Sequence, residues 1–314
     1  MSTVLVTGGT GFIGAFTAQE LVEHGHDVVA FDISTDRQKL SALGVAEDVN
    51  VVRGDVTDAT EVFRAVREHD VDRIVHLAAL LTNTAADDPR AALEVNVLGT
   101  NNVFEAARTF DLDRVAWASS AAVYASPEHY DGDVTEEDLV YPDTLYGATK
   151  EYNEHQASAY EEFGVSHVGL RPTVAYGPYR ETGGSAFLVD LIEKPALGES
   201  FSVEYGDQYI DWQYVRDIAQ AFRKAAFADE ADLSRRVYNV AGETTTIREA
   251  AEVVRRVVPE ADLTVSDEGE LPWTQTLDTT AAERDLGYDP EYDLEAGVRE
   301  YVNVLREEHG LDPV

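Results

Sequence analysis

The fold is decided by the stretch Val4-Leu5-Val6-Thr7-Gly8-Gly9-Thr10-Gly11-Phe12-Ile13-Gly14. It predicts a short apolar strand, a glycine turn and a helix over 11–23. Gly8 permits the tight turn, Gly11 lets a pyrophosphate approach the backbone, and Gly14 lets the helix pack closely on the sheet. The helix start also offers free N–H groups and a positive dipole end to phosphates. Three glycines in this strand–turn–helix order therefore predict a dinucleotide site.

Short apolar runs alternate with amphipathic stretches through the first half of the chain. The predicted strands and helices, in chain order, are strands at 4–7, 26–32, 49–55, 72–77, 114–119 and 166–171, and helices at 11–23, 59–68, 89–110 and 145–163. Strands separated by helices indicate a parallel sheet with helices on both faces. Nearly continuous apolar strands fit a sheet that is buried on both faces. The fold class is therefore α/β, a Rossmann-type doubly wound parallel sheet.

The alternation loosens after Arg171. The remaining elements are predicted as helices at 186–197, 217–228, 247–258 and 294–308, with strands at 202–205 and 237–240. We therefore expect a dinucleotide-binding domain over 1–170, joined by parts of 212–242. Residues 171–314 are expected to form mainly a smaller C-terminal α+β lobe that binds substrate.

Composition restricts the class of protein. The chain has 314 residues, no cysteine, 60 acidic against 24 basic residues and a net charge of −36. Such a surface repels nucleic acid and anionic membranes, and no apolar run approaches the roughly 20 residues of a membrane span. The acids are spread along the chain, which favours a hydrated surface suited to high salt over a cation site. The histidines show no metal spacing. We expect a cytoplasmic protein from a halophilic source, without a metal.

An acid at a strand end predicts the choice of dinucleotide. Asp32 ends the strand Val28-Val29-Ala30-Phe31 and follows Gly14 by eighteen residues. This is close to the spacing of roughly 20 residues expected for the acid that binds the adenosine ribose. A carboxylate there repels a 2′-phosphate and favours NAD, while Arg37 and Arg53 leave some NADP use open.

Two later strand ends complete the predicted cofactor site. Asp55 and Val56, after the third strand, are expected at the edge and face of the adenine. Leu77, Ala78 and Ala79 end the fourth strand with mostly small side chains, which leaves room for the cofactor backbone.

A tyrosine and a lysine indicate which proton-transfer chemistry the site can perform. Tyr146 and Lys150 are four residues apart on a predicted helix, and Lys150 is one of only four lysines in the chain. Side chains at i and i+4 share a helix face, so the ammonium is expected to favour the phenolate of Tyr146 and lower its pKa. A phenolate can remove the proton of a secondary alcohol. Ser120, at the end of the strand over 114–119, is expected to hold the substrate oxygen.

Together these residues resemble the extended short-chain dehydrogenase/reductase family, the branch of nucleotide-sugar epimerases, dehydratases and related dehydrogenases. The motifs that carry the resemblance are Thr7-Gly8-Gly9-Thr10-Gly11-Phe12-Ile13-Gly14, Gly54-Asp55-Val56, His76-Leu77-Ala78-Ala79, Asn96-Val97-Leu98-Gly99-Thr100-Asn101, Ser119-Ser120-Ala121-Ala122-Val123-Tyr124, Tyr146-Gly147-Ala148-Thr149-Lys150 and Leu170-Arg171-Pro172.

The resemblance implies roles for several residues. Ser120, Tyr146 and Lys150 would form the catalytic triad. The cofactor-binding set would comprise Gly8, Gly11, Phe12, Ile13, Gly14, Asp32, Asp55, Val56, Leu77, Ala78, Ala79, Asn96, Tyr146, Lys150, Thr173 and Val174. Asn96 would support the helix near the cofactor, and Thr173 and Val174 would line the nicotinamide. Similar proteins dimerise through the helices that here span 89–110 and 145–163, which implies a homodimer.

One departure from the family pattern bears on the substrate. Nucleotide-sugar enzymes of this family carry an arginine that binds the substrate diphosphate, and Ile210 stands at that position here. Isoleucine cannot pair with a phosphate, although Arg180 and Arg216 remain candidates for that role. Leu81 stands where some 4-epimerases have a lysine. These departures favour a small polyol, free sugar, sugar acid or amino alcohol.

The leading hypothesis is an NAD-dependent dehydrogenase that oxidises a secondary alcohol or hemiacetal carbon of a small sugar-like substrate. Its nearest rival is a nucleotide-sugar 4-epimerase, similar to UDP-glucose 4-epimerase, with the same triad. A non-catalytic nucleotide-sensing module is the third hypothesis.

Overall fold

The computed structural model describes residues 1–124, 126–183, 185–269, 271 and 276–314. Its main feature is a seven-stranded sheet in the order β10-β6-β5-β4-β1-β2-β3, in which all neighbouring strands are parallel. The strands are β1 Thr3–Thr7, β2 Asp27–Asp32, β3 Val49–Arg53, β4 Arg73–His76, β5 Arg114–Ala118, β6 His167–Pro172 and β10 Val237–Val240. The order reverses between β1 and β4, which confirms the predicted Rossmann-type doubly wound fold.

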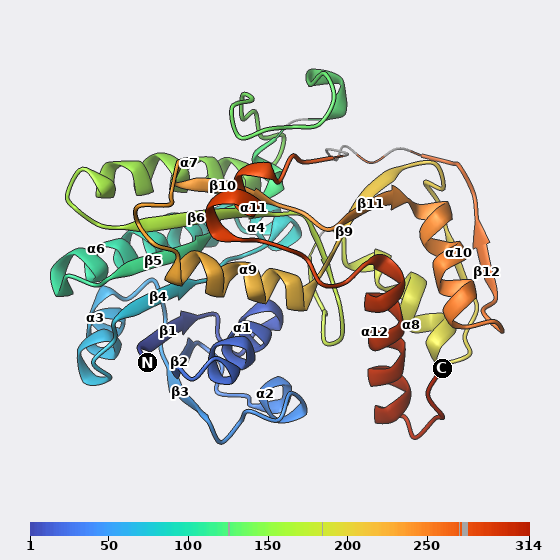
Figure 1. Cartoon of the computed structure of the whole chain (residues 1–314), viewed down its shortest axis with the longest axis horizontal. Coiled ribbons are helices and arrows are strands. Elements are labelled where there is room, and N and C mark those ends of the chain that lie inside the picture. The colour runs from blue at the N-terminus through green and yellow to red at the C-terminus, as the bar shows by residue number, and fades with distance from the viewer. Residues whose placement is uncertain (125, 184, 270, 272–275) are drawn as a thin grey trace.

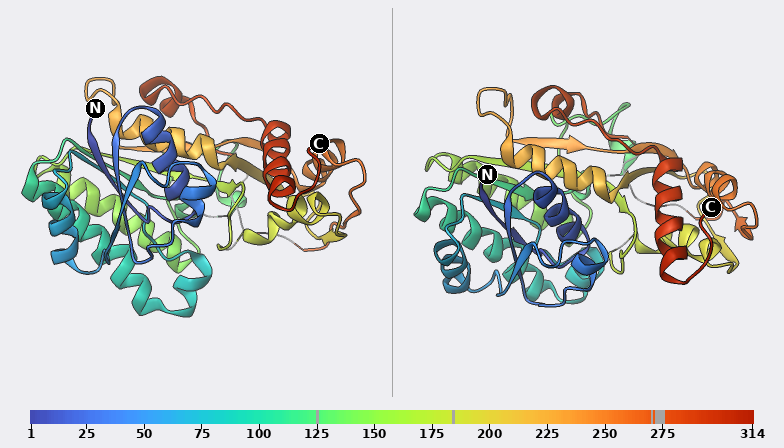
Figure 2. Two further views of the ribbon diagram at one scale, coloured as in Figure 1. Left: turned by 90° about the horizontal axis from the view of Figure 1, so that it is seen from below. Right: turned by 60° about the horizontal axis from the view of Figure 1, so that its bottom comes forward.

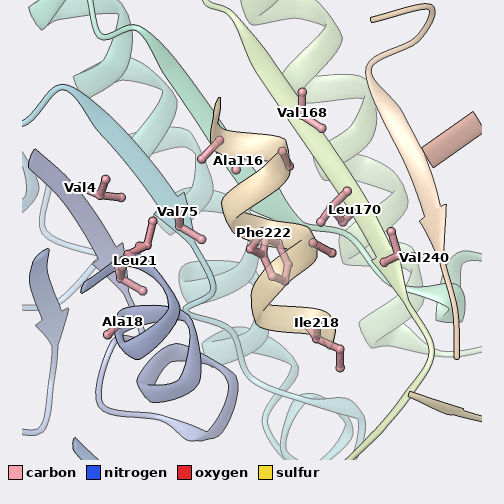
Figure 3. Packing of buried hydrophobic residues seen from close by; sticks show 14 of the residues in the cluster. Val4, Ala18, Leu21, Val75, Ala116, Val168, Leu170, Ile218, Phe222 and Val240 are labelled. Atoms are coloured by element: carbon pink, nitrogen blue, oxygen red, sulfur yellow. The ribbon is translucent and has the colours of Figure 1, made fainter. Parts of the chain in front are cut away.

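Helices cover both faces of this sheet (Figure 1). One face carries α1 (Phe12–Glu23) and α9 (Val215–Phe227), and the other carries α3 (Ala59–Glu68), α6 (Thr100–Phe110) and α7 (Leu145–Glu161). Alternation along a strand explains the two faces, since successive side chains point to opposite sides. Val4 and Val6 of β1 join the first core, and Leu5 joins the second. Figure 3 shows Phe222 and Ile218 of α9 packed among strand residues of the first core.

The C-terminal part contains two smaller sheets. Strands β7 (Val174–Tyr176), β9 (Tyr209–Tyr214) and β11 (Glu243–Thr246) form a mixed sheet, and β8 (Phe201–Val203) pairs with β12 (Leu263–Val265). The helices α8 Asp190–Ala196, α10 Ile247–Val257 and α12 Leu294–Glu308 enclose a second core with these strands. Both views in Figure 2 place this part at one end of an elongated molecule.

The chain crosses between the two parts at the carboxyl ends of strands. Strand β6 leads through Thr173 into β7, β9 leads directly into α9, and β10 leads into β11. In open parallel sheets ligands bind outside the carboxyl ends of the strands. The crossings therefore place the C-terminal part beside the expected ligand crevice.

The predicted helix over 89–110 is interrupted. It consists of α5 (Pro89–Ala92), a π-helical segment (Leu93–Gly99) and α6. The shorter helices α2 (Gln38–Ala42), α4 (Thr82–Asp87) and α11 (Thr280–Leu286) complete the main elements. Across the described residues, none of the helices has the length and apolar character that a bilayer crossing requires.

Candidate active site

The glycine turn has the geometry that a bound phosphate needs. Gly8 has a φ of 68°, and a Cβ on it would lie 3.0 Å from the backbone nitrogen of Ala78. A Cβ on Gly14 would lie 2.0 Å from the Gly8 oxygen, so neither position admits a side chain. Helix α1 begins at Phe12 without a side-chain cap. The first N–H groups of this helix, at Phe12 and Ile13, are thus oriented towards the turn and suit an anionic group.

Asp32 lies beside this turn. Its carboxylate accepts hydrogen bonds from the N–H groups of Thr10 and Ser34, each at 3.1 Å. A negative charge is thereby fixed at the end of β2. Such a charge would favour a ribose hydroxyl over a phosphate, so the role of Asp32 at the cofactor stays a prediction.

The residues after β3 differ in exposure. The Asp55 side chain accepts a hydrogen bond from the Thr57 N–H at 2.9 Å and is partly exposed. Val56 is 5% exposed and packs against Gly99, where a Cβ would lie 2.7 Å from a Val56 methyl group. The structure thus places Asp55 at the surface of the site and Val56 mainly in the core behind it.

The segment after β4 is held against the glycine turn. The Leu77 and Ala78 N–H groups donate to the Thr7 hydroxyl oxygen at 3.2 and 3.3 Å. Ala79 continues this partly exposed segment. The Asn96 side chain fixes its end, because it accepts from the Leu80 N–H at 2.7 Å and donates to the Leu80 carbonyl at 2.9 Å. Asn96 therefore supports the segment directly from the π-helical turn.

Ser120, Tyr146 and Lys150 converge at the carboxyl end of β5. Ser120 forms a hydrogen bond with the Tyr146 phenol. The Lys150 Nζ donates to the Ala118 carbonyl at 2.7 Å and lies 5.6 Å from the centroid of the Tyr146 ring. The i, i+4 spacing thus puts both side chains on one face of α7, as the sequence predicts.

The predicted direction of the Tyr146 pKa is wrong for the chain by itself. Burial raises the pKa of Tyr146 to about 12, and the hydrogen bond with Ser120 offsets only part of this increase. Burial also lowers the pKa of Lys150 to about 8. Both shifts have the same cause, since removal from water disfavours the charged form of each group.

Thr173 lies where the chain passes between the sheets. Its N–H donates to the Gln213 side chain at 3.1 Å, and its hydroxyl donates to the buried Asp211. Val174 pairs with Trp212 and packs against the C-terminal core. The structure therefore connects Thr173 to two polar residues of β9, while Val174 faces apolar neighbours.

The whole chain resembles proteins of known family. A family model described as the NAD-dependent epimerase/dehydratase family matches residues 4–241. The chain belongs to the NAD-dependent epimerase/dehydratase family. A putative UDP-glucose 4-epimerase of Methanocaldococcus jannaschii is 30% identical, over 96% of this chain and 98% of the relative.

Solved structures of two activities align with nearly the full chain. UDP-glucose 4-epimerase of Thermus thermophilus, in complex with NAD, is 28% identical with a TM-score of 0.82, over 97% of this chain and 99% of its own. L-threonine dehydrogenase of Phytophthora infestans is 27% identical with a TM-score of 0.86, over 99% of this chain and 100% of its own. The family is NAD-dependent, and the proteins similar to this chain include dehydrogenases and epimerases.

The sequence reasoning missed a buried ion pair beside Ser120, Tyr146 and Lys150. Glu154 pairs bidentately with Arg171 of β6, at 2.8 and 2.6 Å, and accepts from the Ser119 hydroxyl at 2.6 Å. Glu154 follows Lys150 by four residues. That spacing was the available signal, because it continues the helix face of the tyrosine and lysine.

A second missed group is a chain of polar side chains behind the segment that follows β4. The His76 ring contacts the Thr7 hydroxyl at 2.7 Å and the Thr100 hydroxyl at 2.9 Å, and Thr100 donates to the Asn96 carbonyl at 2.7 Å. Burial, together with the charge of Lys150, lowers the pKa of His76 to about 3. His76 therefore links the glycine-turn strand to the π-helical turn as a neutral ring.

Ile210 and the two arginines considered for its missing role, Arg216 and Arg180, differ in their surroundings. Ile210 is 1% exposed and belongs to the C-terminal core, so it contributes nothing polar to the site. Arg216 is already engaged, because it pairs with Glu300 at 2.6 Å and donates to Gln19 at 2.9 Å. Arg180 pairs with none of the described carboxylates.

Proposed function

We propose that this chain is an NAD-dependent dehydrogenase that oxidises a secondary alcohol or hemiacetal carbon of a small sugar-like substrate. The observation that supports the proposal most is the convergence of Ser120, Tyr146 and Lys150 at the strand ends beside the glycine turn. Bound NAD would supply the hydride acceptor. The cofactor would be held by the glycine turn, by Asp32 and by the segment after β4.

The other steps of the reaction would be carried out by residues of the chain. Ser120 would hold the substrate oxygen through its hydroxyl. Tyr146, as phenolate, would remove the hydroxyl proton while the hydride leaves the same carbon, which yields a ketone or lactone. Lys150 would stabilise the phenolate with its charge. Thr173 would line the site from the crossing between the sheets.

Features of the loop before β9 favour the hypothesis that the substrate is small. In nucleotide-sugar members that the chain resembles, this region holds the substrate diphosphate. Here it lines a cavity of about 450 Å³ whose wall includes the carboxylates of Glu128, Asp207 and Asp267. Arg248 pairs with two of them, and position 210 offers only a buried isoleucine. This loop therefore brings no arginine of its own to a substrate diphosphate.

The second candidate is a nucleotide-sugar 4-epimerase, which is favoured by the similarity to epimerases of that kind. Such an enzyme returns the hydride to its substrate and releases no net NADH. A third candidate, a nucleotide-sensing module without chemistry, would need neither Tyr146 nor Lys150.

The absorbance of NADH separates these candidates. The protein is incubated in high salt with NAD and, one at a time, polyols, free sugars, sugar acids, amino alcohols and nucleotide sugars. Under the proposal, NADH accumulates in proportion to the amount of one small alcohol that is oxidised. Interconversion of UDP-glucose and UDP-galactose without accumulation of NADH would establish the epimerase instead.

A further inference from the structure

The carboxylate of Asp211 lies where three crossings between the two parts of the chain meet. It accepts a hydrogen bond from the Thr173 hydroxyl, after β6, and one from the Gly242 N–H at 2.8 Å, after β10. The Thr244 hydroxyl of β11 donates to its second oxygen at 3.1 Å. Since Asp211 itself belongs to β9, this one side chain connects all three segments that join the large sheet to the C-terminal part.

This carboxylate is buried without a cationic partner among the described residues. Asp211 is 4% exposed, and its three donors are neutral. By contrast, the buried carboxylate of Asp285 pairs with Arg284 at 2.6 Å. Burial raises the pKa of Asp211, and the three hydrogen bonds oppose this increase because they stabilise the ionised form. A buried charge without a counter-ion is screened little by water or salt.

Described contacts connect Asp211 to the strand ends near the triad. Its partner Thr173 follows Arg171 of β6 by two residues. Arg171 and the Ser119 hydroxyl both donate to Glu154 of α7, the helix that carries the tyrosine and lysine of the triad. Strands β5 and β6 are parallel neighbours. Asp211 and Thr173 therefore lie at the edge of the sheet where the triad converges.

We propose that the negative charge of Asp211 favours the oxidised form of bound NAD over the reduced form. This inference rests on the proposed function, in which Thr173 lines the site of the nicotinamide. The nicotinamide ring carries a positive charge in NAD and loses it in NADH. A fixed negative charge nearby therefore stabilises the oxidised form more than the reduced form. Asp211 acts from behind Thr173 and is a positioning residue, not a catalytic one.

This preference suits a dehydrogenase. A dehydrogenase has to release NADH in every turnover, and release of product limits the rate of many enzymes. A site that holds NADH less tightly than NAD releases the reduced cofactor and takes up the oxidised one. An epimerase gains nothing from such a preference, because it keeps the reduced cofactor until the hydride returns to the substrate.

The test compares the dissociation constants of NAD and NADH, measured by calorimetry in wild type, Asp211→Asn and Asp217→Asn. Asparagine keeps an oxygen for the Gly242 N–H and removes the charge. Asp217 is the matched control, because it is also buried, accepts from two neutral backbone N–H groups and has no described contact with Thr173.

The solution conditions isolate the buried charges. Burial raises the pKa of Asp217 to about 6, so a buffer at about pH 8 keeps this control ionised in wild type. Potassium chloride at about 1 M reduces the screening length to about 3 Å. The many surface carboxylates then contribute little to the difference between NAD and NADH.

We expect Asp211→Asn to weaken the binding of NAD by about 10-fold relative to NADH. Two unit charges about 10 Å apart in a protein interior interact by about this factor. Asp217→Asn should change the ratio of the two dissociation constants by less than about threefold. An equal loss of affinity for both forms in Asp211→Asn would overturn the proposal, since it indicates a structural role only. An unchanged ratio would overturn it too.

Wild type by itself also tests the inference, which matters if Asp211→Asn does not fold. Under the same conditions, wild type should bind NAD at least as tightly as NADH. Binding of NADH that is more than about 10-fold tighter would overturn the inference. Neither measurement needs a substrate. The preference can therefore be absent from a protein that oxidises an alcohol, or present in one that forms no NADH, which separates this inference from the proposed function.

Discussion

Lys150 places a positive charge in the interior next to the phenol that it is expected to assist. Its side chain is 3% exposed, and its hydrogen-bond acceptor is the Ala118 carbonyl. Among the described residues no carboxylate pairs with it. The neutral His76 nearby does not compensate this charge. The fold therefore keeps an ammonium beside Tyr146 without a carboxylate partner among the described residues, at a cost in stability.

This cost predicts a pH-dependent difference between wild type and Lys150→Met. The folded chain holds the Lys150 pKa at about 8, below its ordinary value of 10.5, so between these values the unfolded chain binds more protons. Stability then rises with pH in wild type. We expect wild type to gain about 3 kcal/mol in unfolding free energy relative to Lys150→Met between pH 8 and 10.5. Urea denaturation at several pH values measures it, and parallel curves for both proteins would contradict it.

At the scale of single residues, the sequence predicts the positions of side chains better than it predicts the shifts in their pKa values. Spacing along a helix fixes that Tyr146 and Lys150 share a face, because helix geometry is local. The direction of each pKa shift depends on how much water the fold removes, which involves residues far apart in the chain. The pairing of Glu154 with Arg171 of β6 likewise needs tertiary contact. Only the spacing of Glu154 from Lys150 was visible beforehand.

A buried polar cluster helps to fix helix α7 to the sheet. Glu154 of this helix contacts Arg171 of β6 and Ser119 after β5. Arg171 also donates to Tyr124. The cluster holds the helix that carries Tyr146 in register with the strand end that carries Ser120.

We therefore expect Glu154→Gln to destabilise the fold by about 3 kcal/mol, because it leaves a buried guanidinium without a counter-ion. Glu162→Gln, an exposed position at the end of the same helix, should change stability by less than about 0.5 kcal/mol. Chemical denaturation compares the two variants. Equal stability of both would show that the ion pair does not anchor the helix.

The π-helical segment shows which elements are not predictable from sequence. Residues 93–99 include weak helix formers such as Asn96 and Gly99, but the pattern still predicts one continuous helix over 89–110. The wider turn accompanies a long-range contact, since the Asn96 carbonyl accepts from Asn153 of α7 in addition to the local bond from Thr100. Several strands of the large sheet were predictable because they are nearly continuous apolar runs. Strand β9 was not, because it alternates buried apolar and buried polar side chains.

For the molecule as a whole, we propose that the chain forms a homodimer through the helices over 89–110 and 145–163. Leu93, Leu98, Leu145 and Tyr152 are 41% to 54% exposed on these helices, which pack side by side. Contiguous exposed apolar groups mark interaction sites.

Leu98→Glu should convert the dimer to a monomer, because it would bury a charge in the interface. Leu311→Glu, at an exposed leucine near the C-terminus, is the control and should leave the dimer intact. Light scattering reports the mass, which should be about twice 34.5 kDa in wild type. A monomeric wild type at micromolar concentration would refute the proposed interface.

The net charge of −36 also makes a prediction for the whole molecule. Self-repulsion among surface carboxylates opposes the compact state, and salt screens it. We expect the midpoint of thermal unfolding to rise as potassium chloride increases from about 0.1 M to about 1 M, where the screening length falls from about 10 to 3 Å. A midpoint that stays constant or falls would contradict the expectation of a protein suited to high salt.

The most direct test of the central claim is the removal of one oxygen atom, in the variant Tyr146→Phe. With the alcohol that wild type oxidises, we expect this variant to form NADH at least about 100-fold more slowly, since it has no phenol to accept the proton. NAD affinity, measured by calorimetry, should remain within about threefold of wild type, because the glycine turn and Asp32 are unchanged. Undiminished turnover in a variant that binds NAD normally would contradict the claim that Tyr146 performs the chemistry.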